Sequence, residues 1–254
     1  MQYRRLPLTG LHNARELGGW YTPEGLTQYG VFLRTEVPSE ITEEDAAFLR
    51  SYGVTMDIDL RGGQELESMP DKLRDAPWCE YVHLSMFNQQ VARGAGLDKG
   101  KGEAAKSAQP PKDFTWGALY ARMADDHKDW VRDVFEALGR STGIAMFHCT
   151  TGKDRTGIVS ALLLGLCGVA DEDIIADYCV SQVYLGWIYD RMKADLPPSS
   201  AEQQDPFFST SPKNMETLLE HLYENYGGIP GYLRECGVSD ELAARLKNRL
   251  LGKN

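Results

Sequence analysis

Cys149 and Arg155 are the residues of this chain whose types and spacing suggest chemistry most directly. They bound a short segment that contains Gly152 and is followed by Thr156 and a long apolar run. A cysteine beside an arginine at a helix start favours the thiolate, which is the nucleophilic form. With five residues between them, the arginine can grip two oxygens of one tetrahedral anion through its planar guanidinium. The hydroxyl of Thr156 could donate to the sulfur and help it leave in a second step.

The flanks of this segment predict a strand, a tight loop and a buried helix. Residues 144–147 form an apolar run that is too short for a helix, whereas residues 158–164 can form a helix that is apolar on nearly all sides. N–H groups at a helix start lack intrahelical partners and carry partial positive charge, so phosphate binds well there. Gly152 lets the backbone turn its N–H groups inward. The pattern predicts a phosphate-binding loop.

This loop resembles the His-Cys-five-residues-Arg signature of the cysteine-dependent protein-tyrosine-phosphatase superfamily. The matching residues are His148, Cys149, Gly152, Arg155, Thr156 and Gly157. The ending Gly-Lys-Asp-Arg-Thr-Gly is most similar to bacterial enzymes of this kind that also accept phosphoserine, phosphothreonine and phosphoinositides. The resemblance implies hydrolysis of phosphomonoesters through a cysteinyl-phosphate, with no metal or other cofactor. It assigns phosphate binding to Thr150, Thr151, Gly152, Lys153, Asp154, Arg155 and Thr156.

Other stretches extend the resemblance over most of the chain. Residues 13–19, Asn-Ala-Arg-Glu-Leu-Gly-Gly, are similar to a stretch near the start of these enzymes. Arg15 within it could support the active-site loop or form a purely structural salt bridge. Asp177-Tyr178 and Ser181 are similar to the Asp-Tyr-x-x-Ser that follows the core helix in this family.

Asp59-Leu60-Arg61 is similar to the Asp-Leu-Arg that follows a strand in the same enzymes. Side chains at the carboxyl end of a strand in an open α/β sheet can reach the ligand crevice. The alternative is a structural ion pair of Arg61 with Glu65 or Glu67. The sequence leaves both roles open for Asp59 and Arg61.

The general acid that protonates the leaving oxygen is a separate question, because the chain has no Trp-Pro-Asp, the setting of this acid in many relatives. Asp154 is the direct candidate, as in relatives whose loop holds an Asp there, although it must keep its proton beside Lys153 and Arg155. Lys153 implies binding of a second phosphate, as in phosphoinositide-specific members; the alternative is a solvated side chain. The further candidates for the acid are Asp59, Asp113, Asp125 and Asp126.

Two other classes of function fit parts of the pattern. A rhodanese-type sulfurtransferase also uses a cysteine loop before a helix, but its chemistry does not explain Arg155 and Thr156. A catalytically inactive phosphate-binding module would not need Cys149, Asp154 and Arg155 together. We therefore expect an enzyme acting on a phosphorylated protein, with a phosphoinositide as the alternative substrate.

Composition narrows the partners and the compartment. The net charge of −10 argues against nucleic acid as a partner and against stable membrane association. The five cysteines lack a Cys-x-x-Cys pair, which indicates reduced thiols, and no histidine spacing suggests zinc. No signal peptide or membrane-spanning run is visible, so the chain is expected in the cytoplasm, or exported without a recognisable signal.

Strands that alternate with helices predict one α/β domain over residues 1–254. We expect a central, mostly parallel sheet of four or five strands, helices on both faces, and Cys149 at the carboxyl end of a central strand. The expected strands are 31–34, paired with 17–21, then 54–61, 81–84 and 144–147. The expected helices are a segment from Thr42 to Gly53, 114–124, 127–140, one capped by Asp171, 213–226, 229–236 and 239–251. Residues 88–113, rich in Gly, Ala and Lys, are predicted to be a flexible insertion or lid.

Overall fold

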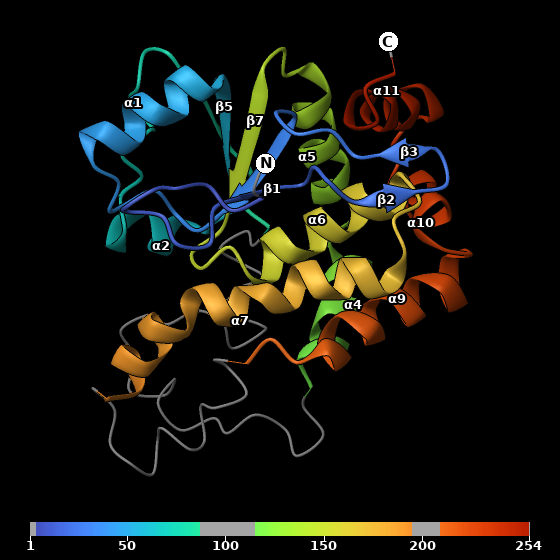
Figure 1. The fold of residues 1–254 in the computed structure, drawn as a ribbon. Helices are drawn as coiled ribbons and strands as arrows, with labels where there is room; N and C mark the ends of the chain where they lie inside the picture. The colour runs from blue at the N-terminus through green and yellow to red at the C-terminus, as the bar shows by residue number, and fades with distance from the viewer. Residues whose placement is uncertain (1–3, 87–114, 195–208, 254) are drawn as a thin grey trace.

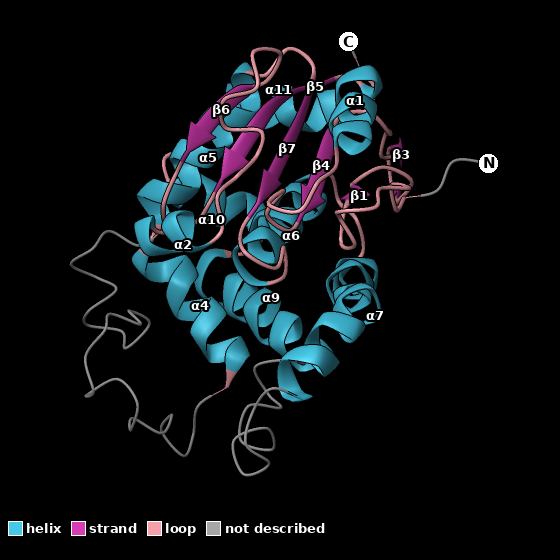
Figure 2. Ribbon diagram, turned by 90° about the vertical axis from the view of Figure 1, so that its left-hand side faces the viewer, coloured by secondary structure: helices cyan, strands magenta, loops and turns pink. Residues whose placement is uncertain are grey.

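The computed structural model describes residues 4–86, 115–194 and 209–253, and these form an α/β fold around one five-stranded sheet. The strand order is β1 (Arg15–Glu16), β4 (Phe32–Thr35), β7 (Ile144–His148), β5 (Val54–Asp59) and β6 (Glu80–His83). β4, β7, β5 and β6 are parallel, and β1 is antiparallel to β4. Figure 2 shows the four parallel strands ending at the same edge, beside the start of α6 (Asp154–Leu166).

Helices cover both faces of the sheet, as expected. One face packs against α4 (Trp116–Asp126), α5 (Lys128–Arg140), α6, α9 (Pro212–Tyr226), α10 (Ile229–Glu235) and α11 (Asp240–Leu250). The other face packs against α1 (Glu43–Tyr52) and the segment around Leu73. α2 (Gly63–Ser68) follows β5, and α7 (Asp171–Ala194) lies along α6 (Figure 1).

The central strand β7 is buried on both faces because its side chains alternate between two cores. Ala145 and Phe147 face the core that contains α6, while Ile144 and Met146 face the core beside α1. This explains why its sequence is an uninterrupted apolar run. His148 is the last residue of the strand and Cys149 follows it directly, so the predicted position of the cysteine at the end of a central strand is confirmed.

Local sequence signals predicted both ends of α1 correctly. Thr42 and Asp45 form a capping box at the start of the helix, and Gly53, with φ 106°, ends the helix. Two expectations are wrong in detail. β4 pairs with Arg15–Glu16, and of the expected residues 17–21 only Leu17 still bonds to it, through its N–H to the carbonyl of Phe32 at 3.0 Å. The chain then turns away into a small hairpin of β2 (Tyr21–Thr22) and β3 (Gly25–Leu26).

The second error concerns α7. Asp171 is its first residue rather than its cap, because the N–H of Ile174 bonds to the carbonyl of Ala170. The predicted insertion or lid at 88–113 lies outside the described residues. In the part of the chain that the structure describes, no helix is long and apolar enough to cross a membrane.

Candidate active site

The loop between β7 and α6 has its carbonyl groups bound by neighbouring segments. The carbonyl of Thr150 accepts a hydrogen bond from the N–H of Val37 at 3.2 Å. The carbonyl of Thr151 accepts one from the side-chain amide of Asn13 at 3.0 Å. In a trans peptide the C=O and N–H point in opposite directions. The N–H groups that follow these carbonyls therefore point away from Val37 and Asn13, as an anion-binding loop requires.

Gly152 is required at its position in this loop. Its φ is 67°, in the left-handed region, and a Cβ there would lie 2.3 Å from the carbonyl oxygen of Thr35. Its own carbonyl accepts a hydrogen bond from Nη2 of Arg34 at 2.6 Å. A side chain at residue 152 would therefore both strain the backbone and displace the loop from β4.

Arg155, the second residue of α6, is oriented by a two-point ion pair with Glu65 of α2. Nη1 donates to Oε2 at 2.7 Å, and Nη2 donates to Oε1 at 2.6 Å. Nη1 also donates to the carbonyl of Leu60 at 3.3 Å, and the hydroxyl of Thr150 donates to the Glu65 carboxylate. A guanidinium carries five N–H donors in one plane, so a carboxylate on one edge is compatible with a phosphate on another.

Charge is strongly coupled at this place. Burial would lower the pKa of Arg155, but the hydrogen bonds that its guanidinium donates to Glu65, together with the negative charge of that carboxylate, raise it. Burial would raise the pKa of Glu65, but the hydrogen bonds and charge of Arg155 hold it at about 2. Both groups are therefore charged at neutral pH. Cys149 itself is buried, with 1% of its surface exposed.

A second, buried network connects the loop to α7. Asp177 accepts hydrogen bonds from Nε of Arg15 at 3.0 Å and from Nη1 of Arg34 at 2.5 Å. Arg15 also donates to Ser181 at 3.0 Å and to the carbonyl of Asn13 at 2.9 Å. Arg15 therefore forms a buried salt bridge and also contacts Asn13, whose side-chain amide binds a loop carbonyl. Its support of the loop stays a prediction.

A family model described as the tyrosine phosphatase family matches residues 6–252. The chain belongs to the tyrosine phosphatase family. It is 30% identical over 227 residues to a tyrosine-protein phosphatase of Nostoc commune, covering 86% of this chain and 74% of the relative. It is 26% identical over 289 aligned positions to the triple specificity protein phosphatase PtpB of Mycobacterium tuberculosis, covering 99% of this chain and 100% of the relative. The family therefore supports a phosphatase over a sulfurtransferase.

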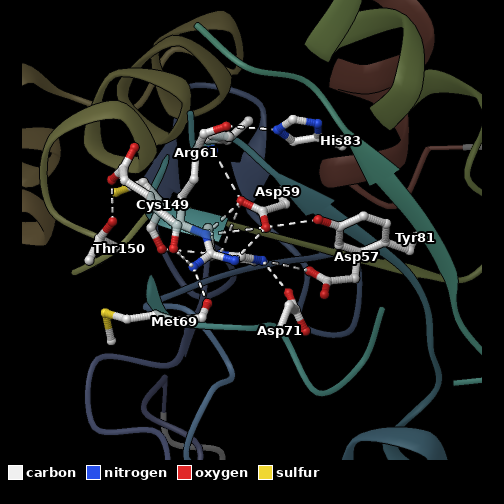
Figure 3. Close-up of polar contacts among 12 residues, drawn as sticks. Asp57, Asp59, Arg61, Met69, Asp71, Tyr81, His83, Cys149 and Thr150 are labelled. Atoms are coloured by element: carbon white, nitrogen blue, oxygen red, sulfur yellow. Dashed lines mark hydrogen bonds and ion pairs between the residues drawn. The ribbon is translucent and has the colours of Figure 1, made fainter. Parts of the chain in front are cut away.

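Asp59 and Arg61 of this tyrosine phosphatase pair with each other (Figure 3). Nη2 of Arg61 donates to Asp59 at 2.7 Å, and both side chains are fully buried. Arg61 contacts the main-chain carbonyls of Glu65 and Met69, not a carboxylate of Glu65. The predicted structural partner, Glu65 or Glu67, is therefore wrong, because Glu65 is bound to Arg155. Burial would raise the pKa of Asp59, but the hydrogen bonds and charge of Arg61 hold it at about 2.

Asp154 begins α6 and is the candidate acid that lies in the phosphatase loop itself. The hydroxyl of Tyr120, in α4, donates to its Oδ1. Tyr120 also contacts the hydroxyl of Tyr178 at 2.9 Å, and Tyr178 accepts a hydrogen bond from Asn214 at 3.1 Å. Lys153 lies 3.6 Å from the same Oδ1. Asp154 is thus held by a chain of hydrogen bonds that reaches α9.

The other candidate acids have partners elsewhere. Asp125 accepts hydrogen bonds from His221 at 2.9 Å and from Tyr226 at 2.6 Å. Asp126 pairs with Arg122 on the exposed face of α4 at 3.4 Å. Asp59 is committed to Arg61, and Asp113 lies outside the described residues. Among the described carboxylates proposed from the sequence, Asp154 is therefore the best placed.

Lys153 is not the solvated side chain that was one of its two alternatives. It is 2% exposed, and its Nζ lies 5.0 Å from the ring centroid of Trp116 and 6.0 Å from that of Tyr189. It also donates to the carbonyl of Ser209 at 3.5 Å. The expected bond of Thr156 to the sulfur is not formed, since among the described residues its buried hydroxyl has no hydrogen-bond partner.

His148 precedes the cysteine and is fully buried between carboxylates. Its Nδ1 lies 3.1 Å from the carbonyl of Cys149, and its Nε2 lies 2.9 Å from Oδ2 of Asp71 and 3.4 Å from Oδ1 of Asp57. Burial would lower the pKa of His148, but the charge of Asp57 raises it well above its usual value. Burial raises the pKa of Asp57 to about 7.

Sequence reasoning missed several residues that shape this phosphatase site. Glu65 was considered only as a partner of Arg61, and Tyr120 and Arg34 only fell within a predicted helix and a predicted strand. Glu65 and Arg155 are 90 positions apart, so no local pattern links them. Asn13, which binds the carbonyl of Thr151, could have been found from the sequence, because it lies inside the stretch that resembles the family.

Proposed function

We propose that this phosphatase hydrolyses phosphomonoesters in two steps through a cysteinyl-phosphate on Cys149. The thiolate attacks phosphorus in line, a P–S bond forms, and the alcohol or phenol leaves with a proton. Water then attacks phosphorus, the P–S bond breaks, and inorganic phosphate and the thiolate are released. The observation that carries the proposal is the loop whose carbonyls are bound on one side, beside an Arg155 that Glu65 orients.

Arg155 and the loop N–H groups supply the electrostatic stabilisation. Charge grows on the equatorial oxygens of the phosphoryl group, and preorganised donors act on it without reorganising. The ion pair with Glu65 supports this role, because it restricts the guanidinium to one orientation before substrate arrives. Thr150, Thr151, Gly152, Lys153 and Thr156 complete the proposed phosphate-binding loop.

Asp154 is proposed to move the proton in both steps. It would protonate the leaving oxygen first and take a proton from water second. The support is positional: Oδ1 of Asp154 accepts a hydrogen bond from the hydroxyl of Tyr120 and lies 3.6 Å from Nζ of Lys153, so the carboxyl group is held in place at the start of α6.

The proposed substrates are phosphotyrosine proteins, with phosphoserine and phosphothreonine also accepted. The likeness to a phosphatase whose name states triple specificity supports this breadth. Phosphoinositides are a second candidate class of substrate, and Lys153 is the residue that supports it. A buried cation beside the loop attracts a second phosphate more strongly than a solvated cation would.

The covalent step is tested with Cys149→Ser and, as a matched control, Cys179→Ser in α7. A phosphotyrosine peptide is mixed with each enzyme, quenched in acid and analysed by mass spectrometry. We expect a phosphoryl group on Cys149 in the wild type and in Cys179→Ser, and neither this adduct nor turnover in Cys149→Ser. Near-wild-type turnover by Cys149→Ser would reject the mechanism, and failure of the wild type to turn over an aryl phosphate would indicate an inactive module.

The role of Asp154 is tested with Asp154→Asn on two esters. If Asp154 is the acid, alkyl phosphates should slow far more than activated aryl phosphates, which need little protonation. If it is mainly the base, both should slow alike and the cysteinyl-phosphate should accumulate. Equal slowing without accumulation would remove Asp154 from proton transfer.

The phosphoinositide candidate is tested with Lys153→Ala. A loss of kcat/KM confined to phosphoinositides, with phosphotyrosine peptides unchanged, supports binding of a second phosphate by Lys153. An equal loss on both substrates contradicts it.

A further inference from the structure

Three buried side chains converge on one point on the far side of His148 from the nucleophile. Asp57 lies in β5, His148 ends β7, and Asp71 follows α2 (Figure 3 labels the two aspartates). All three side chains are at most 1% exposed. Their ligating atoms lie within 4.8 Å of one another. Nothing in the proposed reaction uses this cluster.

The inner atoms of the cluster lie close to one another, with Nε2 of His148 2.9 Å from Oδ2 of Asp71, but they form no hydrogen bond of good geometry, whereas its outer atoms are hydrogen-bonded. Among the described residues, no hydrogen bond is made by either oxygen of Asp57, by Oδ2 of Asp71 or by Nε2 of His148. In contrast, Oδ1 of Asp71 accepts a hydrogen bond from the N–H of Leu73 at 2.7 Å. Nδ1 of His148 lies 3.1 Å from the carbonyl of Cys149, which fixes it as the nitrogen that carries the hydrogen.

This arrangement has a shortage of positive charge. Buried carboxylates are costly unless a partner neutralises them. Nε2 lies within 3.4 Å of both carboxylates but can carry only one hydrogen, which cannot serve both in good geometry. A divalent cation would neutralise two carboxylates and would accept electron pairs from all the unpartnered atoms at once.

We propose that Asp57, Asp71 and His148 bind a divalent cation of the zinc class as a structural site. Imidazole nitrogen with carboxylate oxygen is a donor set that suits Zn²⁺. Ligating histidines almost always donate their other N–H to a carbonyl or carboxylate, and ligating carboxylates are themselves hydrogen-bonded. The Cys149 carbonyl and the Leu73 N–H provide these outer contacts. The cation would tie β5 to β7 and fix His148 beneath the phosphate loop.

The sequence does not indicate this site, because its ligands have no metal-binding spacing. Asp57 and His148 lie on neighbouring parallel strands, where Asp57 pairs with Met146 and Asp59 pairs with His148. Side chains two residues apart on a strand share a face, so Asp57 and His148 meet only once the register is set. Asp71 then reaches them from a loop on the same face.

The test uses the full chain in the Cys149→Ser background, so that the catalytic thiol cannot bind metal. The protein is stripped with a chelator, and Zn²⁺ binding is measured by equilibrium dialysis with elemental analysis. Stoichiometric binding and a higher melting temperature with Zn²⁺ are expected. Asp57→Asn and Asp71→Asn should each weaken binding by more than about 100-fold, since losing a ligand exceeds losing an outer contact. Asp125→Asn, which alters a different His–Asp pair, should bind as the parent does.

Absorption of the Co²⁺-loaded protein provides a readout that needs no variant. Ligand-field bands of a nitrogen and oxygen site without a sulfur charge-transfer band support the proposal. The proposal is overturned if the parent protein binds no Zn²⁺ at concentrations well above that of the protein, if Asp57→Asn binds as tightly as the parent, or if the Co²⁺ spectrum shows thiolate ligands. These outcomes do not depend on phosphatase activity.

Discussion

Two arginine–carboxylate systems contact the loop between β7 and α6, and they differ in exposure and in stoichiometry. In the Arg155–Glu65 pair, the side chains are 11% and 33% exposed, and one carboxylate meets one guanidinium. In the Arg15–Arg34–Asp177 network, every side chain is at most 2% exposed, and one carboxylate serves two guanidiniums. The first system holds a guanidinium at the start of α6, and the second connects the loop to α7 and β4.

The difference in exposure between the two systems suggests that they have different tasks, the buried one fixing the loop and the partly exposed one orienting Arg155. Removing one partner of a partly exposed pair costs less stability, because water screens the charge that remains. In a buried network, removal of one partner is strongly destabilising, because it leaves buried charge without compensation. The buried network also carries one excess positive charge beside Gly152. Burial and the charge of Arg34 lower the pKa of Arg15 to about 10, so Arg15 is charged at neutral pH and favours an anion in the loop.

The largest effect is expected from Arg155→Lys. An ammonium cannot contact Glu65 and a phosphate with the same planar geometry, so kcat/KM for an aryl phosphate should fall by about 100- to 1000-fold. The melting temperature should change little. Arg122→Lys, in an exposed pair on α4, is the matched control and should leave kcat/KM unchanged. Preserved activity in Arg155→Lys would remove Arg155 from its assigned role.

Asp177→Asn should produce the opposite pattern, with the damage in stability. It leaves Arg15 and Arg34 buried without a counter-charge, so the free energy of unfolding should fall by about 3–5 kcal/mol. Denaturant titration measures this loss. Asp126→Asn, which breaks an exposed pair, should cost less than about 1 kcal/mol. Equal losses in the two variants would contradict the contrast between buried and exposed systems.

Glu65→Gln tests orientation without removing the arginine. The amide keeps the size of the side chain but loses its charge and one acceptor oxygen, so Arg155 and Thr150 are less well fixed. We expect kcat/KM to fall by about 10- to 100-fold, mainly through kcat, with a small change in melting temperature. A change confined to KM would indicate that Glu65 does not orient Arg155 in the transition state.

The smallest expected effect is on the pH dependence of stability. Arg155 depresses the pKa of Glu65 to about 2 from an ordinary value of 4.5. A depressed pKa means that the stabilisation is complete above the unfolded value and is lost as pH falls through the folded value. The stability difference between the wild type and Glu65→Gln should therefore be constant from neutral pH down to the unfolded pKa, and should shrink below it. A difference that disappears near neutral pH would be inconsistent with this pairing.

Local physical signals in the sequence were sufficient for the loop and its setting. Cys149, Gly152 and Arg155, between a short apolar run and an apolar helix, specify a strand, a turn and a helix start by local rules alone. The same is true of the capping box at Thr42 and the helix stop at Gly53. Such features depend on dihedral preference and hydrogen bonding within a few residues, so they can be recognised without a fold.

Tertiary structure alone decided which charges pair. Arg61 pairs with Asp59 rather than with Glu65, and Glu65 pairs with Arg155. Asp57 lies beside His148. Strand register and burial determine which of these side chains come into contact. Several carboxylates lie within plausible reach of each arginine along the chain, and their local sequences do not distinguish them. The partner is selected by the desolvation that each arrangement costs and by the hydrogen bonds that offset it, and both depend on the assembled fold.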